Sequence, residues 1–184
     1  VYKRQESGSV DIDLSAHCPG GETPASVRIC RPRSLLVLGA GKDAEPLVSF
    51  AHTLGWRVAV FDHRPACLEN PQLQSAEALQ CGEAGQAADL IDLGGMDAAI
   101  IMSHSLTGDK NYLLALANSS VGFVGLIGPP HRRDRLLSEI GEHAAKLVDR
   151  LHAPVGTRIG GRGPAAIALE VVAELQAYFS DERT

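Results

Sequence analysis

One short stretch limits the folds open to this chain: the apolar run 35–38 stops abruptly at two spaced glycines, Gly39 and Gly41. A continuous apolar run of this length is typical of a strand that is buried on both faces of a parallel sheet. Apolar residues then recur at helical spacing over 44–54, and Gly55 follows as a stop signal. The stretch therefore predicts a strand, a tight turn and a helix in direct succession.

Strand and helix signals continue to alternate along the rest of the chain. Further strands are predicted at 57–61, 76–81, 98–102 and 122–127. Further helices are predicted at 84–93, 109–117, 132–140, 142–151 and 164–179, and the last of them is amphipathic. Alternation of this kind implies parallel strands joined by right-handed crossovers. We therefore expect an α/β fold: a doubly wound, mostly parallel sheet with helices on both faces.

The first 32 residues lack this periodicity and are rich in serine, glycine, proline and acidic residues. We interpret residues 1–32 as a linker or the remnant of a missing N-terminal domain, and residues 33–180 as the α/β domain. The chain starts without methionine and without an apolar leader. We therefore expect it to be a piece of a longer protein.

Composition narrows the class of protein. Of the 184 residues, 45% are hydrophobic and 21% are charged, which is the balance of a soluble globular protein. No apolar stretch approaches the roughly 20 residues that cross a bilayer. The net charge of −5 argues against a nucleic-acid partner. The four cysteines are scattered without a Cys-x-x-Cys pair, so we expect reduced thiols in a cytoplasmic protein.

The motif Gly-x-Gly-x-x-Ala at 39–44 stands where a dinucleotide-binding turn belongs. Its first glycine permits the tight turn, and its second lets a pyrophosphate approach the backbone. Asp62 ends the next strand about 20 residues further on, where a carboxylate accepts hydrogen bonds from a ribose diol. Arg64 either meets an additional phosphate or pairs with Asp62. The competing interpretation is that the glycines only make the turn compact and Asp62 caps a loop.

Other polar residues follow later strands at the same predicted edge. His104 comes after the strand at 98–102, and Asp109 is placed either to orient it or to cap the next helix. Beyond Gly128, which ends a strand, Arg132 and Arg133 either hold phosphate or carboxylate groups or form part of a solvated helix face.

The segment before the last helix is rich in glycine and includes Gly156. It predicts either an anion-binding concavity or a plain flexible loop. The sequence contains no Gly-x-Ser-x-Gly elbow, no Tyr-x-x-x-Lys pair and no cluster with metal-ligand spacing. We therefore predict no catalytic residue and no metal ligand.

Five segments, taken in order, resemble the C-terminal Rossmann domain of the XdhC/CoxI family of xanthine dehydrogenase accessory proteins. They are LLVLGAG, VAVFDHRP, IIMSHSLTGD, FVGLIG and LHAPVGTRIGGRGPAAIALEVVAEL. The resemblance implies a protein that binds the molybdenum cofactor, helps it acquire its sulfido ligand through a sulfurtransferase, and delivers it to a molybdenum hydroxylase. It places at family positions Gly39, Gly41, Asp62, His104, Asp109, Gly125, Gly128 and Gly156.

We therefore expect a non-catalytic carrier of molybdopterin or its dinucleotide. Its expected partners are a client molybdenum hydroxylase, a cysteine desulfurase and a second copy of the chain. Two alternatives stay open: an NAD(P)-dependent oxidoreductase and a nucleotide-sensing module. The expected cofactor-binding residues are Gly39, Ala40, Gly41, Asp62, Arg64, His104, Asp109, Gly128, Arg132, Arg133 and Gly156. Of these, Gly39–Gly41 and the two later arginines are expected near phosphate, and His104 and Asp109 near the pterin or metal end.

Overall fold

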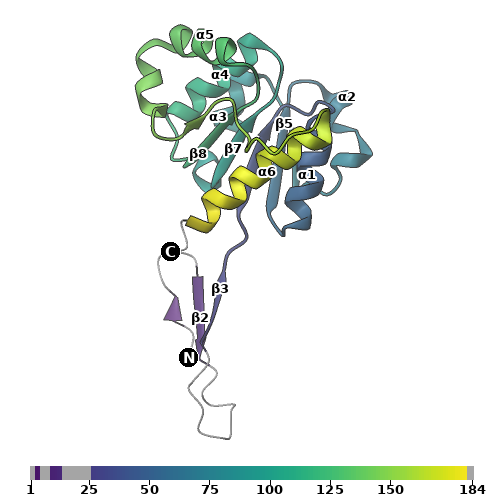
Figure 1. The fold of residues 1–184 in the computed structure, drawn as a ribbon, viewed down its shortest axis with the longest axis vertical. Helices are drawn as coiled ribbons and strands as arrows, with labels where there is room; N and C mark the ends of the chain where they lie inside the picture. Colours follow the sequence, from purple (N-terminus) through teal and green to yellow (C-terminus); the bar gives the residue numbers. More distant parts are fainter. Residues whose placement is uncertain (1–2, 5–8, 14–25, 182–184) are drawn as a thin grey trace, which may run out of the picture. The chain divides into compact units, whose positions relative to one another are not determined.

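The computed structural model describes residues 3–4, 9–13 and 26–181, and it divides into two compact units, Val1–Pro32 and Arg33–Thr184 (Figure 1). In the first unit the described residues form an antiparallel sheet of β1 (Lys3–Arg4), β2 (Ser9–Asp13) and β3 (Ser26–Cys30). No strand was predicted here. The alternation of valine and isoleucine with polar residues in SVDID and SVRIC is a strand signal, but each run is only five residues long. Apart from residues 31 and 32, the rest of the predicted linker lies outside the described residues.

The second unit is built on a six-stranded sheet whose order is β6-β5-β4-β7-β8-β9. Every neighbouring pair in it is parallel. The strands are β4 (Ser34–Leu38), β5 (Arg57–Asp62), β6 (Ala78–Cys81), β7 (Ala98–Ile101), β8 (Phe123–Leu126) and β9 (Leu151–His152). This is the strand order of the doubly wound dinucleotide-binding fold. The predicted fold class is confirmed.

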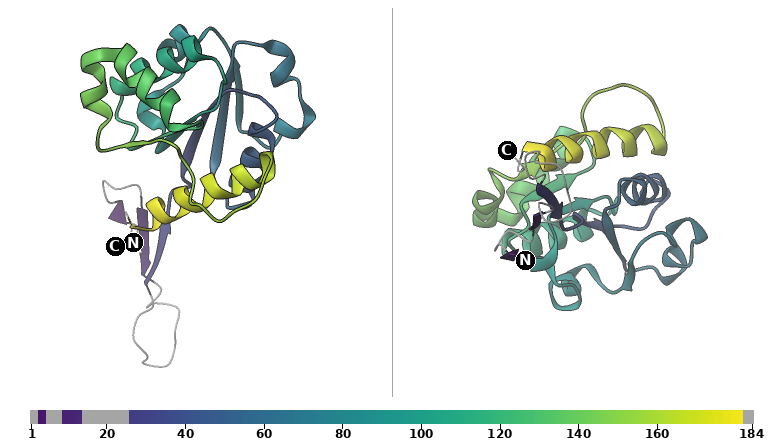
Figure 2. Two further views of the ribbon diagram at one scale, coloured as in Figure 1. Left: turned by 45° about the horizontal axis from the view of Figure 1, so that its top comes forward. Right: turned by 90° about the horizontal axis from the view of Figure 1, so that it is seen from below.

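Helices cover both faces of this sheet (Figures 1 and 2). One face packs against α1 (Ala44–Thr53) and α6 (Pro164–Asp181), and the other against α3 (Ala87–Leu90), α4 (Leu106–Ala117) and α5 (Pro130–Ile140). In β4, Leu35 and Val37 belong to the first core, and Leu36 and Leu38 to the second. Because both faces are covered, the strand is apolar at successive positions rather than at alternate ones. Among the described helices, none combines the length and apolar character that a bilayer span needs.

Three predicted segments differ from the structure. The predicted helix 84–93 is broken into η3 (Ala84–Gln86), α3 and η4 (Leu93–Gly95). The side chain of Asp92 accepts a hydrogen bond from the N–H of Gly94, which starts η4 as a separate turn. The connection between β5 and β6, for which no helix was predicted, holds two short helices, α2 (Pro65–Leu68) and η2 (Pro71–Leu73).

The predicted helix 142–151 is instead η5 (Gly141–Leu147) followed by β9. Gly141 has a positive φ of 57°, which ends α5. Arg150 then donates to four carbonyl oxygens at and beyond the end of α4, those of Leu116, Ala117, Ser119 and Val121. These are among the carbonyls that a helix end leaves without partners. Arg150 thus anchors the start of β9 beside β8.

The chain leaves β4 on one side of the sheet, toward β5 and β6, and returns to pair with β4 on the other side as β7. Ligands of doubly wound folds bind beyond the carboxyl ends of the strands at such a switch point. Here the two strand ends approach closely, since a Cβ on Gly39 would lie 2.7 Å from the carbonyl oxygen of Met102. Gly39 also has φ +119°, so the position requires glycine for two reasons.

Candidate functional site

The glycine turn between β4 and α1 lies at the switch point, but one of its donors is already used. The N–H of Ala40 donates to Oδ2 of Asp62 at 2.6 Å, and the N–H of Gly39 donates to the carbonyl oxygen of Phe61. Within the described residues, no acceptor is recorded for the N–H groups of Gly41 and Lys42. These two N–H groups, at the positive start of α1, are therefore the donors left for an anion.

Asp62, at the end of β5, is only 1% exposed and is surrounded by donors. Besides Ala40, its carboxylate accepts from the backbone N–H, Nε and Nη2 of Arg64 at 2.8, 2.9 and 2.8 Å. Burial by itself raises the pKa of Asp62, but the hydrogen bonds from Arg64 and Ala40 outweigh it and lower the pKa to about 2. The pairing of Arg64 with Asp62, one of two interpretations left open by the sequence, is what the structure contains.

His104 follows β7 and lies across the glycine turn. Its φ is +58°, unusual for a residue other than glycine. Its Nε2 lies 2.9 Å from Oδ2 of Asp43, just before α1, and its Cδ2 is 4.0 Å from where a Cβ on Gly41 would be. The side chain is 61% exposed. His104 is therefore paired with Asp43, and the prediction that Asp109 orients it is wrong.

Asp109 is not the cap of α4 either. The cap is Ser105, whose Oγ accepts from the N–H of Gly108, and Asp109 lies one turn inside the helix. It is 1% exposed and accepts from Oγ of Ser103 at 2.5 Å and from Nε and Nη2 of Arg132 at 3.0 and 2.7 Å. Because the helix starts three residues earlier than predicted, this side chain faces the core and ties α5 to the end of β7.

The two predicted phosphate-binding arginines are engaged within the protein. Arg132 pairs with Asp109, and Nη1 of Arg133 donates to the carbonyl oxygen of Ala153 at 2.9 Å. Gly128 has φ +137°, and a Cβ there would lie 2.9 Å from Cδ of Arg132. The glycine thus leaves space for the arginine to reach its buried partner.

The glycine-rich segment before α6 is held by two carboxylates of that helix. Gly156 donates its N–H to Glu174 at 2.5 Å, and the N–H groups of Ile159 and Gly160 donate to Glu170 at 3.2 and 3.0 Å. These groups are occupied by carboxylates, so the predicted anion-binding concavity is not formed at Gly156. The loop arches outside α6 (Figure 2).

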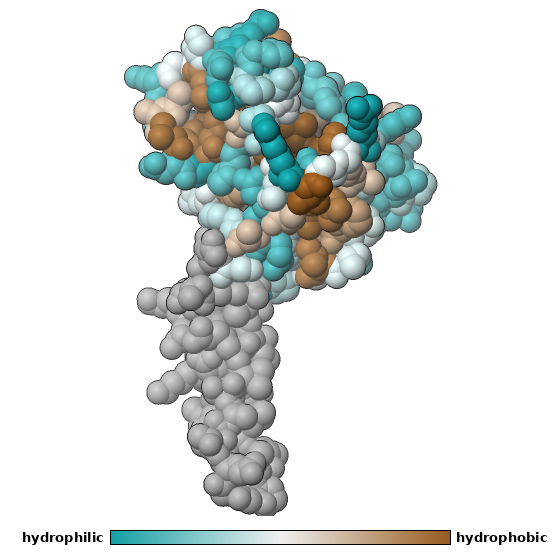
Figure 3. All heavy atoms as spheres, in the orientation of Figure 1, coloured by the Kyte–Doolittle hydropathy of each residue, from teal (hydrophilic) through white to brown (hydrophobic). Residues whose placement is uncertain are grey.

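The side chains of this loop are exposed, among them Arg158 and Arg162. Figure 3 shows apolar side chains gathered beside hydrophilic ones on the face that carries α6. The large exposed apolar residues of the loop and the helix are Ile159 and Leu169. The loop therefore carries exposed arginine side chains, although backbone N–H groups of the loop are already hydrogen-bonded to carboxylates of α6.

A cavity of about 350 Å³, which we call the edge cavity, lies between the connection after β6 and the first turns of α4. None of its lining residues is among the ligand contacts predicted from the sequence. The polar side chains that line it are those of His63, Glu83, Ser103, Ser105, Thr107, Asn111 and Tyr112. Burial and the nearby Asp62 and Asp109 raise the pKa of Tyr112 well above its usual range, so its hydroxyl stays protonated. In the sequence, the signal that could have identified Tyr112 is its spacing, because it follows Asp109 by about one helical turn.

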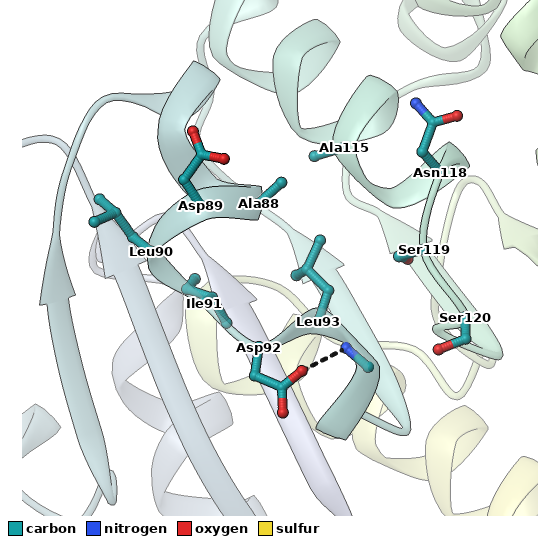
Figure 4. A pocket seen from close by; sticks show the side chains of 11 residues that line it. Ala88, Asp89, Leu90, Ile91, Asp92, Leu93, Ala115, Asn118, Ser119 and Ser120 are labelled. Atoms are coloured by element: carbon teal, nitrogen blue, oxygen red, sulfur yellow. Dashed lines mark hydrogen bonds between the residues drawn. The ribbon is translucent and has the colours of Figure 1, made fainter.

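A second cavity, of about 720 Å³, lies beside the amino-terminal ends of β7 and β8 (Figure 4). Its lining includes Asp89, Leu93, Asn118 and Ser120 and none of the predicted site residues. Since doubly wound folds bind ligands at the opposite edge, we place the candidate site at the carboxyl ends. Among the described residues, no group of three or more His, Cys, Asp or Glu side chains is arranged to hold a metal ion.

This chain is similar in sequence to known proteins. The family model described as the XdhC Rossmann domain matches residues 35–175. A protein of Bacillus subtilis (strain 168) that is described as a probable subunit of xanthine dehydrogenase is 34% identical over 145 residues, covering 79% of this chain and 42% of that protein. The uncharacterized protein YqeB of Escherichia coli (strain K12) is 31% identical over 154 residues, covering 82% and 28%.

A crystal structure of a xanthine dehydrogenase from Bacillus halodurans superimposes with a TM-score of 0.76 at 28% identity, covering 86% of this chain and 47% of that one. The chain thus spans less than half the length of each of these three proteins.

Proposed function

This chain belongs to the XdhC family, and from that membership we propose that it is the Rossmann module of a xanthine dehydrogenase accessory protein. In this proposal the module holds the molybdenum cofactor, as molybdopterin or its dinucleotide, for delivery to a client molybdenum hydroxylase. A cysteine desulfurase supplies the sulfur for the terminal sulfido ligand. The cofactor is cargo here, and the chemistry of its metal belongs to the client.

The observation that carries the proposal is the pairing of the charged groups around the switch point. Asp62 is bound to Arg64, Asp109 to Arg132, and Asp43 to His104. Groups held in this way position a ligand but are not poised as a nucleophile with its base. A carrier needs such a surface, because it must bind its cargo without reacting with it and then release it.

Donors suited to a phosphorylated cargo remain at this edge. They are the N–H groups of Gly41 and Lys42 at the start of α1, the partly exposed Arg64, and Arg158 and Arg162 on the loop before α6. His104 stands over the same turn, where a bound ligand would meet its ring. In our proposal these residues bind and orient the phosphate end.

An NAD(P)-dependent oxidoreductase is the competing function, and the state of Asp62 weighs against it. Both of its carboxylate oxygens already accept hydrogen bonds, so a ribose diol would have to displace the Arg64 guanidinium. Calorimetry with NAD and NADP separates the possibilities. We expect no binding at micromolar concentration; binding with hydride turnover would favour the oxidoreductase, and binding without turnover a nucleotide sensor.

The direct test is co-expression of the chain in a host that makes molybdopterin, followed by an assay for the fluorescence of oxidised pterin in the purified protein. Gly41→Asp places a carboxylate at the start of α1 and should abolish retention, because it repels phosphate. Gly41→Ala is the matched control, and a Cβ at this position has space. Pterin absent from the wild-type chain, while a known carrier retains it, would refute the proposal.

A further inference from the structure

The edge cavity has an electrostatic character unlike that of a phosphate site. Within the part of the chain that the structure describes, no arginine or lysine lines it, and its charged member is the carboxylate of Glu83. The guanidinium groups of Arg64 and Arg132 are paired with Asp62 and Asp109. The formal charge of the lining is therefore negative, which favours a ligand that brings its own N–H donors over an anion.

Two lining side chains have hydrogen-bonding capacity that the protein does not use. Among the described residues, no partner is recorded for the amide of Asn111 or the hydroxyl of Thr107, and both line the cavity. Glu83 accepts one bond, from the N–H of Gln86, which leaves further lone pairs free. Ser103 and Ser105, by contrast, are used within the chain. The free groups include the Glu83 carboxylate, the Asn111 amide and the Thr107 hydroxyl, and the Tyr112 hydroxyl likewise has no hydrogen-bond partner among the described residues.

The shape of the cavity limits what can enter. Its volume of about 350 Å³ is near the lower end of ligand sites, which suits one ring system rather than a whole dinucleotide. Gly85 of η3 and Gly108 of α4 both line it, and η3 packs against α4. Because neither wall carries a side chain at these glycines, the space between them admits a flat group.

We propose that the edge cavity binds the aminopyrimidinone edge of a flat heterocycle, which is the pattern of amino group, ring nitrogen and carbonyl that pterin and cytosine share. Glu83 accepts from the amino group, and Asn111 donates to the carbonyl oxygen; the ring nitrogen between them carries a hydrogen in pterin and a lone pair in cytosine. The inference rests on the proposed function for the source of the ring, and it separates two parts of the site. The ring lies between η3 and α4, and the phosphate end lies at the start of α1.

The test uses the chain with free pterin, cytidine and uridine as probes. Pterin is followed by its fluorescence, and the nucleosides by calorimetry and amide NMR shifts. Pterin or cytidine should bind and shift the N–H signals of Gly85, Thr107 and Asn111. Uridine, which has a carbonyl in place of the amino group, should bind at least about tenfold more weakly. Binding of pterin alone identifies a pterin site, and binding of cytidine identifies a nucleotide site.

Gly85→Leu should fill the cavity and lower affinity at least about tenfold. A Cβ at Gly85 has Asn111 Nδ2 as its nearest neighbour at 3.9 Å, so the substitution is tolerated at that atom. Asn111→Asp, which removes the donor without changing size, should give a similar loss. Ala88→Leu, in the cavity at the opposite edge, is the control and should bind as wild type.

The inference is overturned if neither pterin nor cytidine binds, if uridine binds as tightly as the tighter of these two, or if folded Gly85→Leu protein binds as wild type. Its failure is separable from failure of the proposed function. If co-expressed wild type and Gly85→Leu retain equal pterin, the carrier function stands and this site does not. If wild type retains no pterin yet binds cytidine as described, the site stands and the carrier function does not.

Discussion

At the residue scale, two buried aspartates at the carboxyl ends of the strands are each paired with an arginine. The separation between the aspartate and the arginine along the chain differs between the two pairs. Asp62 pairs with Arg64, its near neighbour, and Asp109 pairs with Arg132 from the following helix. Removing one partner of a buried pair leaves an uncompensated charge, which costs far more than the pair itself contributes. The two pairs therefore differ in function: the first shapes the glycine turn, and the second joins α4 to α5.

Asp109→Asn should lower the free energy of unfolding by about 3 kcal/mol, because Arg132 is left buried without a counter-charge. The matched control is Glu139→Gln, which breaks the exposed pair with Arg135 and should cost less than about 1 kcal/mol. Urea denaturation of both variants measures the difference. Equal losses would show that the Asp109 pair is not the buried tie we describe.

The depressed pKa of Asp62 predicts an acid dependence of stability. A carboxyl with a folded pKa of about 2 stabilises the protein above its unfolded pKa of about 4, and that contribution is lost as pH falls toward 2. Asp62→Asn should therefore be less stable than wild type by about 2 kcal/mol at pH 6, and the gap should narrow between pH 4 and pH 2. Urea denaturation across this range measures the gap, and a constant gap would contradict the prediction.

At the element scale, the ends of β4 and β7 meet at the glycine turn. Gly39 combines a positive φ with a crowded position, whereas Gly55, at the end of α1, has a positive φ of 76° and open space around it. Comparing Gly39 with Gly55 therefore separates two effects of adding a side chain. Both positions have a positive φ, which strains any other residue, but only at Gly39 would the added Cβ also collide with neighbouring atoms.

Gly55→Ala should cost about 1 kcal/mol, which is the strain of a positive φ alone. Gly39→Ala should cost about 3 kcal/mol or more, because the end of β7 must also move away from the new methyl group. Thermal and urea unfolding of the two variants provide the comparison. Similar values for both would mean that the turn adapts and that the strand ends are not tightly packed.

Elements whose signal is local were predictable. The strands at the centre of the sheet and the helices α1 and α6 follow from periodicity and glycine stop signals. The helix at 84–93 failed because Asp92 forms its own turn, and the helix at 142–151 failed because Arg150 is used by the end of α4. Side chains that form such contacts look like ordinary helix residues in a sequence.

At the scale of the whole molecule, the α/β unit contains the two hydrophobic cores that the described residues form. Among these residues each core is built from Leu35 onward, so the unit Arg33–Thr184 has what a domain needs to fold by itself. A chain beginning at Arg33 should therefore unfold cooperatively, with a midpoint within about 3 °C of the longer chain. Circular dichroism during heating tests this, and loss of the cooperative transition would contradict it.

The α/β class and the doubly wound arrangement could be predicted without a structure, as could the carboxyl edge where we place the candidate site, since these depend on periodicity and on the rule that parallel strands end together. The partners of the charged groups depend instead on how the elements pack. Asp109 binds Arg132 rather than His104, the loop at Gly156 is held by Glu174, and the edge cavity forms between η3 and α4. Periodicity is a property of neighbours along the chain, whereas a buried charge takes the partner that packing brings within reach.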